Sequence, residues 1–481
     1  MGWLTFDDLD ETECWLANAV VSGTALELAE PVPIRAELIR QILLGGFHWP
    51  DRLAADPRGI RVRGAIIVGR LDLSGVRSAL PLELLDCACP DGIVLSGAHL
   101  SNVDFSGLVC PWLIGTEVVV ERSLRLLGVR MARVNLFGAR IGGVLELSEA
   151  RLTNPDGVAL HGGNLDVGGG MFLRDLVADG SGEDGTVRLA GAVVGNQLNL
   201  RGAHLTNADG PALVADYLRT GSNLILSAGF RAEGRKDTGT VRLVGATIQG
   251  RLNLEDGQAL AREPGALALN IGRVQVAGDV LFPASFLGGA VNLDGFRYTR
   301  IIRSSVPEFL AVLANRTNSY SAQPYRQFAA THLATGNERD VRLINIAAQR
   351  DLLRRGRLDF WARAWHRVTG LVLGYGYRPS RALLWWAGTV ALALVLSVGI
   401  AGPAGLITGH GAGCGVVDQA GLALNTATPL VKPAGQPDCQ LDSGTALGGV
   451  LTVAGWLIQA LSWAFVTLFV AGFTGVVRKN P

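Results

Sequence analysis

The sequence predicts a mainly β protein, a parallel β-helix with helical caps that is followed by two C-terminal transmembrane helices. Three observations predict this fold class. A fourteen-residue pattern recurs within residues 60–300, the hydrophobic period changes after Arg300, and two long runs without any charge follow. We therefore expect a helical cap at 1–59, the β-helix at 60–300, a helical neck at 301–370 and a membrane domain at 371–481.

The recurring pattern places apolar residues at offsets 0, 2, 7, 11 and 13, and Gly-Ala at offsets 4 and 5. The short apolar steps have a period of two, which sends their side chains to one side of the backbone. Gly or Asn at offset 9 predicts a corner with positive φ. Successive turns are roughly 22–29 residues long where they can be matched. The clearest copies are IRVRGAIIVGRLDL (60–73), VNLFGARIGGVLEL (134–147), VRLAGAVVGNQLNL (187–200) and VRLVGATIQGRLNL (241–254).

A parallel β-helix explains this pattern, because each coil is too short to bury its own apolar side chains. Stacked coils, about 4.8 Å apart, bury them in one continuous core. A leucine-rich repeat needs a helix or a longer segment opposite each strand, and these turns leave no room for one. A βαβ fold fails because no amphipathic helix of about ten residues separates the strand-like pieces.

Helical spacing marks both ends of the predicted β-helix. Ile34–Leu44 carries apolar residues at nearly helical spacing, between prolines and a glycine pair. Three further helices are expected at 307–315, 323–335 and 338–355. Solenoid ends need covers, so we interpret these pieces as caps, and the second group also as a neck. A helical hairpin that binds a partner is the alternative for the second group.

Residues 382–401 and 447–477 contain no charged residue. A bilayer-spanning helix needs about 20 apolar residues, so we expect spans at about 382–403 and 452–477 rather than two buried core helices. Positive charge flanks both runs on the same side, and the loop 404–446 is net acidic. The positive-inside rule then places both termini and the β-helix in the cytoplasm, with the loop outside the inner (plasma) membrane.

A basic and aromatic segment precedes the first uncharged run. Ten Arg and three Asp lie between Arg339 and Arg381. Cationic and amphipathic aromatic side chains beside a span favour contact with anionic lipid over contact with nucleic acid. The predicted membrane-interface residues are Arg354, Arg355, Arg357, Trp361, Arg363, Trp365, Arg367, Arg378 and Arg381.

The six cysteines divide along this topology. Cys414 and Cys439 lie in the external loop, where oxidising conditions permit a disulfide, although their spacing leaves two free thiols open. The other four are expected to remain reduced in the cytoplasm. Cys87 and Cys89 have period-two spacing, which favours two buried strand residues over half of a metal or redox site.

Polar residues between the apolar positions form two predicted outward columns. Such columns can bind an elongated ligand, but we favour a solvated sheet face with alternating charge, and a cytoplasmic solenoid has little access to extracellular polysaccharide. No motif predicts a catalytic residue or a metal site. Gly168-Gly169-Gly170 has no helix after it, so no dinucleotide cofactor is expected. One column contains Asp72, Glu146, Asn199 and Asn253, and the other contains Arg61, Asn135, Arg188 and Arg242.

Several stretches carry a resemblance to known proteins. AHLSN followed by VDFSG (98–107), and LDLSG (71–75), resemble pentapeptide repeats, whose fold is a right-handed quadrilateral β-helix. The wider order of segments is similar to a group of actinobacterial membrane proteins that join such a solenoid to two C-terminal helices. Proteins of this group are often labelled "membrane-associated oxidoreductase". The segments are AELIRQILLGG, RGIRVRGAIIVGRLDLSG, QPYRQFAATHLATGNERDVRLINIAAQRDLLRRG, GYGYRPSRALLWW and AGFTGVVRK.

These features predict a non-enzymatic, membrane-anchored scaffold that presents the β-helix to an unidentified protein partner, with membrane lipid as a second partner. A membrane-associated oxidoreductase, by resemblance alone, is the alternative. An oligomeric pore or sensor is a second alternative, since Gln459 in the second span suggests packing between copies. GYG (374–376) precedes the first span, so it does not predict a potassium filter. The net charge of +1 argues against nucleic acid as a partner.

Overall fold

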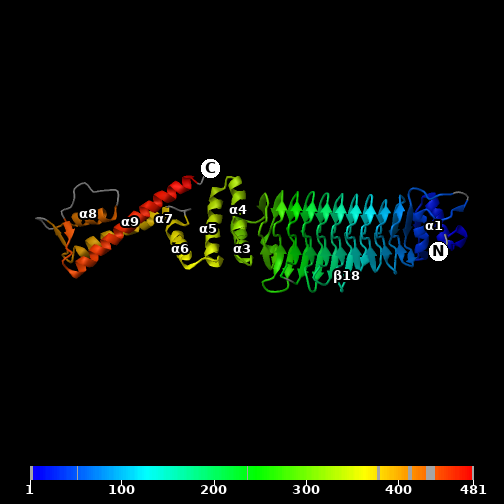
Figure 1. Ribbon diagram of the computed structural model, residues 1–481, viewed down its shortest axis with the longest axis horizontal. Helices are drawn as coiled ribbons and strands as arrows, with labels where there is room; N and C mark the ends of the chain where they lie inside the picture. Colours follow the sequence, from blue (N-terminus) through cyan, green and yellow to red (C-terminus); the bar gives the residue numbers. More distant parts are fainter. Residues whose placement is uncertain are drawn as a thin grey trace. The chain divides into compact units, whose positions relative to one another are not determined.

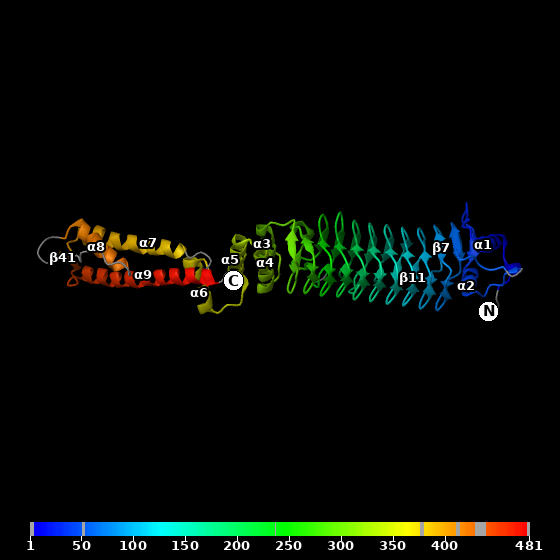
Figure 2. The same cartoon turned by 90° about the horizontal axis from the view of Figure 1, so that it is seen from above.

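The computed structural model describes residues 4–50, 53–235, 237–375, 380–409, 414–428 and 439–478. The chain divides into two compact units, Met1–Asp340 and Val341–Pro481. The N-terminal unit holds long parallel sheets of very short strands, and the C-terminal unit is helical (Figure 1, Figure 2).

Successive coils of the N-terminal unit contribute strands to four parallel sheets of 12, 10, 9 and 7 strands. Leu82 pairs with Val103 of the next coil, and Leu224 pairs with Leu252 in the same way further along the stack. The predicted solenoid-like stack of parallel strands is therefore confirmed. The coil between Leu82 and Val103 is slightly shorter than the range that the sequence predicts.

Two of the sheets run the length of the stack. The 12-stranded sheet contains β1 (Leu26–Glu27), β3 (Ile60–Arg63), β7 (Leu82–Leu85), β10 (Val103–Asp104), β13 (Leu124–Arg125), β17 (Leu145–Glu146), β21 (Met171–Phe172), β25 (Leu198–Asn199), β29 (Leu224–Ile225), β33 (Leu252–Asn253), β37 (Asp279–Leu281) and β40 (Arg300–Ile302). The 10-stranded sheet contains β5 (Leu71–Asp72), β8 (Ile93–Val94), β11 (Trp112–Ile114), β15 (Arg133–Asn135), β19 (Leu160–His161), β23 (Val187–Arg188), β27 (Leu213–Val214), β31 (Val241–Arg242), β35 (Leu267–Asn270) and β39 (Ala290–Asn292).

The other two sheets complete the coils. The 9-stranded sheet contains β6 (Arg77–Ser78), β9 (His99–Leu100), β12 (Val119–Val120), β16 (Arg140–Ile141), β20 (Asp166–Val167), β24 (Val193–Val194), β28 (Arg219–Thr220), β32 (Thr247–Ile248) and β36 (Gln275–Val276). The 7-stranded sheet contains β14 (Arg130–Met131), β18 (Arg151–Asn154), β22 (Val177–Gly180), β26 (His204–Asn207), β30 (Arg231–Gly234), β34 (Gln258–Ala261) and β38 (Leu287–Gly288).

The core of the stack consists of columns of inward-facing apolar side chains. Leu145, Met171, Leu198 and Leu224 follow one another in register in the 12-stranded sheet, and all four are fully buried. Full burial of such a side chain contributes about 1.5–3 kcal/mol. Each coil obtains this burial only from the coils above and below it, so the coils stabilise one another.

Glycine is needed at two places in a coil, for two different reasons. Gly138, the glycine of a Gly-Ala pair, has a φ of 66°, so the left-handed corner lies at offset 4 of the repeat. The predicted positive φ at offset 9 is confirmed for Gly69, with a φ of 83°, and is wrong for Gly143, Asn196 and Gly250. Close stacking explains glycine in that region instead. A Cβ atom at Gly195 would lie 2.2 Å from the carbonyl oxygen of Gly168 in the preceding coil.

The N-terminal end of the stack is covered by two helices, but it is not a purely helical cap. A short turn η1 (Phe6–Asp8), then α1 (Glu11–Ser22), precede β1, and α1 was not predicted. The predicted helix over Ile34–Leu44 begins at residue 36 as α2 (Ala36–Leu44), because Ile34 belongs to β2 (Pro33–Arg35), which pairs with β4 (Ile66–Val68). Strands β1 and β2 therefore form the first rung of the sheets.

An ion pair between the buried Glu13 and the partly exposed Arg35 joins α1 to β2. Glu13 is fully buried, and it accepts hydrogen bonds from the backbone amide of Arg35 at 3.0 Å and from its guanidinium Nε at 2.8 Å. Burial opposes the charged form of Glu13, but the hydrogen bonds and charge of Arg35 outweigh it and lower the pKa of the carboxyl. This pair fixes the helical cover to the first rung.

The other end of the stack is covered by α3 (Val306–Asn315) and α4 (Ala322–Ala334), after the turn η3 (Ala284–Phe286). The ring of Phe309 lies 5.8 Å from that of Phe282 in the last coils and 4.7 Å from that of Phe328 in α4. α5 (Glu338–Arg355) follows. The sequence predicted α3 to α5 to within one residue at each end.

The C-terminal unit contains two helices that are long and apolar enough to cross a membrane, over Ser380–Ala401 and Ala446–Ala471. In the most apolar 18-residue segment of each helix, only 11% of the residues are buried, so most of the apolar side chains lie on the surface. The elements are α6 (Phe360–Leu373), α7 (Ser380–Leu394), its π-helical continuation η4 (Val395–Ala401), β41 (Ile407–Gly409), α8 (Val416–Ala427), β42 (Cys439–Leu441) and α9 (Ala446–Arg478).

The loop predicted to be external over 404–446 contains a helix that packs against the apolar helices. Ala423 and Ala427 of α8 are buried in one cluster with Ala393 of α7 and Ile458 of α9. Figure 2 shows α8 lying between α7 and α9. The alanines and glycines of this segment allow close helix packing, which the charge pattern alone did not indicate.

Two neighbouring substitutions test the inward and outward alternation. Leu252→Asp places a charge in the core, where Leu252 is fully buried, and we expect it to lower the free energy of unfolding by more than about 4 kcal/mol. Asn253→Asp lies on the partly exposed outer side and should change it by less than about 0.5 kcal/mol. Chemical denaturation of the purified full chain measures both, and equal effects would contradict the alternation.

Candidate functional site

The structure separates the first predicted outward column. Glu146, Asn199 and Asn253 occupy equivalent positions of the 12-stranded sheet, in strands β17, β25 and β33. Asp72 lies in β5 of the 10-stranded sheet, on another side of the coils. Its placement with the other three was therefore wrong.

The second predicted column changes in the same way. Asn135, Arg188 and Arg242 lie in β15, β23 and β31 of the 10-stranded sheet, and their register partners connect them to Asp72. Arg61 lies in β3 of the 12-stranded sheet, so its placement was also wrong.

The two errors have one cause, which is that each coil has two similar halves. Ile60 lies in the 12-stranded sheet and Leu71 in the 10-stranded sheet, whereas Val134 lies in the 10-stranded sheet and Leu145 in the 12-stranded sheet. Both pairs have the same separation in the sequence and carry the same apolar pattern. The first copy of the repeat was therefore aligned half a coil out of phase.

Most charges of these columns have partners within the protein. The Nη2 atom of Arg174 lies 3.4 Å from Glu146, and the Nη1 atom of Arg188 lies 2.6 Å from Asp184. Arg242 pairs with Asp216 at 2.5 Å, Arg61 donates to the carbonyl oxygen of Gly23, and Arg40 approaches Asp72 at 3.9 Å. Exposed ion pairs of this kind contribute about 0–1 kcal/mol, so the columns form a solvated surface rather than a row of free binding groups.

A hollow with aromatic ends lies where the 10-stranded and 9-stranded sheets meet. Its volume is about 530 Å³, and both Phe137 and Tyr217 line it. Tyr217 is 61% exposed. Two coils lie between these residues, with Gly163 and Ala190 at the intervening positions. The two residues therefore lie roughly 14 Å apart along the stack, and Asn164 also lies between them. We call this feature the Phe137–Tyr217 hollow.

Polar groups form one wall of the Phe137–Tyr217 hollow. His161, Asp184 and Arg188 line it, and the ring of His161 lies 5.4 Å from that of Phe137. Burial, and then the charge of Arg188, lowers the pKa of His161, so its imidazole is neutral at pH 7 and can both donate and accept a hydrogen bond. A second hollow of about 690 Å³, lined by Phe137 and the exposed Val193, adjoins it.

The Phe137–Tyr217 hollow suits an apolar side chain of a protein partner. Aromatic rings that are exposed beside polar groups are typical of the centre of protein interfaces. The sequence analysis did not find this site, because Phe137 and Tyr217 fall outside the apolar positions of the repeat. Two aromatic residues at outward corner positions were the available signal.

A separate candidate site is the amphipathic helix α6 of the C-terminal unit. Phe360, Trp361, Trp365, Val368 and Leu371 lie on one face at helical spacing, and all are exposed, Trp361 by 78%. A helix with an exposed apolar face and arginines beside it is typical of a helix that lies in the membrane interface. Arg363 and Arg367 border this face, one helical turn from Phe360 and Leu371 respectively.

The remaining predicted interface residues differ in their surroundings. Arg354 and Arg355 pair with Asp351, which is buried, so both charges stabilise α5; the Arg354 side chain is exposed, whereas that of Arg355 is only 20% exposed. Arg357 is exposed between α5 and α6, and Arg381 lies in the first turn of α7. Arg378 lies outside the described residues.

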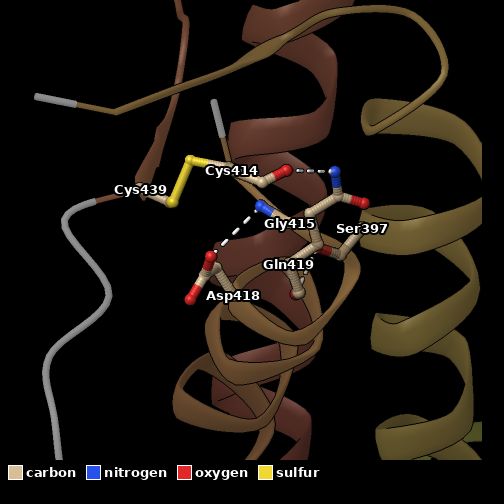
Figure 3. Close-up of a disulfide and its surroundings, with 6 residues drawn as sticks. All are labelled: Ser397, Cys414, Gly415, Asp418, Gln419 and Cys439. Carbon is tan, nitrogen blue, oxygen red and sulfur yellow. Dashed lines mark hydrogen bonds between the residues drawn. A yellow bond between two sulfur atoms is a disulfide. The ribbon is translucent and has the colours of Figure 1, made fainter. Parts of the chain in front are cut away.

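Cys414 and Cys439 form a disulfide in the structure, with their Cα atoms 6.2 Å apart (Figure 3). The disulfide joins the residues just before α8 to β42. Two hydrogen bonds continue the connection: Gln419 Nε2 donates to the carbonyl oxygen of Cys414 at 3.1 Å, and Ser397 Oγ donates to that of Gln419 at 2.7 Å. The start of α8 is thereby fixed to the end of the first apolar helix.

The other four cysteines are free, and three of them are in the core of the stack. Cys87, Cys89 and Cys110 are buried, whereas Cys14 is partly exposed. The predicted burial of Cys87 and Cys89 is confirmed, but both flank an isolated bridge at Ala88 and do not lie in a strand. Burial raises the pKa of Cys110 to about 11, and it also raises the pKa of Cys87 and Cys89. The thiolate form, which is the reactive and metal-binding form, is therefore disfavoured at neutral pH.

Within the part of the chain that the structure describes, no three His, Cys, Asp or Glu side chains form a group that could hold a metal ion. No protein-family model matches the chain, and no curated protein and no solved structure matches it.

Counting reactive thiols tests these assignments. In the folded, unreduced protein we expect a maleimide reagent to label no cysteine other than Cys14, because burial and a raised pKa protect the other free thiols. After denaturation without reductant, four of the six cysteines should react, and all six should react after reduction. Six reactive thiols before reduction would contradict the disulfide.

Proposed function

We propose that the protein is a non-enzymatic scaffold that is anchored in the inner (plasma) membrane. In this proposal Ser380–Ala401 and α9 cross the bilayer, and both termini and the stacked sheets lie in the cytoplasm. The stack is a right-handed quadrilateral β-helix of the pentapeptide-repeat type, and its Phe137–Tyr217 hollow binds a protein partner. The observation that carries the proposal is a rigid stack with an exposed aromatic hollow, on a chain that also has two largely exposed apolar helices.

The C-terminal unit supports membrane anchoring. Its apolar helices leave large side chains such as Leu384, Val450, Trp456 and Leu457 on the surface, each more than half exposed. Water would make such a surface aggregate, whereas the hydrocarbon of a bilayer solvates it. The exposed aromatic face of α6 adds an interfacial contact beside the first span.

The charge and redox pattern supports the orientation. Arg381 begins the first apolar helix and Arg478 ends the second, so both cationic ends fall on one side of the spans. The Cys414–Cys439 disulfide lies at the opposite end of these helices, where an oxidising compartment favours it. The buried free thiols of the stack suit the reducing cytoplasm.

The hollow favours a protein partner over an extended polymer. Phe137, Tyr217 and the glycine and alanine residues of its lining form a local site that spans a few coils. The charged side chains of the polar columns, in contrast, mostly pair with other residues of the stack. Partners that bind such a site contribute most of their binding energy through one or two apolar side chains at its centre.

A double substitution in the hollow tests the proposed interface. Phe137→Ser with Tyr217→Ser removes both rings without altering an inward-facing residue, so the stack should remain folded. We expect at least an about tenfold loss of one protein that co-purifies with the wild-type chain, measured by quantitative mass spectrometry after detergent extraction.

The matched control for this experiment is Leu127→Ser. Leu127 is 39% exposed and Phe137 is 37% exposed, but Leu127 does not line the hollow. The control should retain the same co-purifying protein. Equal recovery from all three proteins, or no protein that depends on the hollow, would contradict the proposed interface.

The orientation is tested by labelling one exposed position of the stack. Arg251 is exposed, so Arg251→Cys in a Cys14→Ser background provides one reactive thiol, whereas Cys87, Cys89 and Cys110 are buried. A membrane-impermeant maleimide should label this variant only after the cells are permeabilised, because the stack lies in the cytoplasm. Labelling in intact cells would reverse the proposed topology.

A further inference from the structure

Helix α8 runs antiparallel to the first apolar helix and extends well along it. Near the disulfide, Ser397 Oγ donates to the carbonyl oxygen of Gln419 at 2.7 Å. One helical turn further, Ala423 packs in the cluster that contains Ala393. At the end of α8, the indole Nε1 of Trp386 donates to the carbonyl oxygen of Ala427 at 3.3 Å.

These contacts fix how far α8 descends along the proposed span. Gln419 and Ala427 are eight residues apart in α8, which corresponds to about 12 Å along a helix. Gln419 itself lies opposite Ser397, one turn inside the end of η4 at Ala401. The C-terminal end of α8 therefore lies roughly 18 Å inside that end, near the middle of a hydrocarbon core about 30 Å thick. With Ser380–Ala401 across the bilayer, α8 is a re-entrant membrane helix.

Two exposed amide side chains lie at this depth. Asn425 is exposed in the last turn of α8, and Gln459 is exposed in α9 next to the buried Ile458 of the same cluster. Neither amide has a side-chain hydrogen bond to any residue that the structure describes. An amide without a partner in hydrocarbon costs roughly 2–7 kcal/mol in general, so a bilayer requires that something satisfy both.

Asn425 and Gln459 lie near the contact between α8 and α9. Thr426, the neighbour of Asn425, faces α9 at Gly455, where a Cβ atom would lie 3.7 Å from the Thr426 methyl carbon. Gln459 follows Gly455 by one helical turn and so lies on the same side of α9 as α8. Both amides are exposed within one helical turn of the contact between α8 and α9, and the exposed surface beside this contact is called the α8–α9 flank.

We propose that this α8–α9 flank binds a second copy of the chain inside the bilayer, with Asn425 and Gln459 forming hydrogen bonds between the copies. The proposal rests on the membrane anchoring proposed above. An amide carries both donors and an acceptor, so identical amides can pair across a two-fold axis without any other chemistry from the partner. Interhelical hydrogen bonds of this kind and close packing at small residues hold membrane helices together.

Self-association is measured on the full chain in vesicles of phosphatidylethanolamine and phosphatidylglycerol. Chains that carry Arg251→Cys and Cys14→Ser are labelled with either a donor or an acceptor dye, and energy transfer is followed as lipid is added. Energy transfer between wild-type chains should fall as added lipid dilutes them, and this decrease gives a dissociation constant. Asn425→Leu with Gln459→Leu should raise this constant by at least about threefold.

Two further variants keep the test specific. Asn425→Gln with Gln459→Asn retains both amides and should stay within about twofold of the wild-type constant. Leu457→Ala changes an exposed residue of α9 two positions before Gln459 and should have no effect, because residues two apart do not share a helix face. An equal effect of Leu457→Ala and of the double Leu variant would overturn the assignment of the flank.

Failure of the membrane proposal gives a different result from failure of the self-association proposal. Release of the protein from membranes by alkaline carbonate would show that the helices do not span the bilayer. Retention in carbonate without energy transfer at any lipid ratio would overturn the proposed pairing alone. The pairing is supported if the wild-type chain is retained in carbonate and shows energy transfer, and if the double Leu variant loses that transfer.

Discussion

The structure depends on the burial of aliphatic columns between coils that cannot fold separately. Each coil supplies an inward side chain to a column, and the next coil covers it. This constraint explains the glycines whose backbone contacts the preceding coil, and it explains the helices at both ends. Glu13 and Arg35 fix one end, and the Phe282, Phe309 and Phe328 rings fill the other.

The sequence predicted the stack because its period-two pieces and corner glycines are local signals. It could not resolve the phase of the first coil, since Ile60 and Leu71 begin two half-coils with the same apolar pattern. Register between coils is a long-range property, and only the observed pairing of β3 with β7 separates the alternatives. The same limit hid β1 and β2, whose pairing partners β3 and β4 lie beyond α2 in the sequence.

The candidate sites were predicted less well than the fold. The arginines near the first span predicted a membrane-interface role for Trp361 and Trp365. The expected oxidising compartment predicted a disulfide between Cys414 and Cys439. Both signals depend on composition and can be read from the sequence. The Phe137–Tyr217 hollow and the packing of α8 depend on which coils and helices become neighbours. The chain thus combines a polar stack that carries one aromatic hollow with an apolar unit whose surface suits lipid. Membrane anchoring does not explain the hollow, and the stack does not explain the apolar surface.

Hydrogen exchange of the full chain in a lipid nanodisc tests the central claim most directly, because it reports the pairing of backbone amides in every coil. Mutual burial of the coils predicts slow exchange at the paired amides throughout Leu82–Val280, with faster exchange confined to the end coils and to the corners. The protection should recur once in each coil at the strands of the 12-stranded sheet, and again at the strands of the other sheets. Rapid exchange in the central coils, or protection that is continuous as in long helices, would contradict the account.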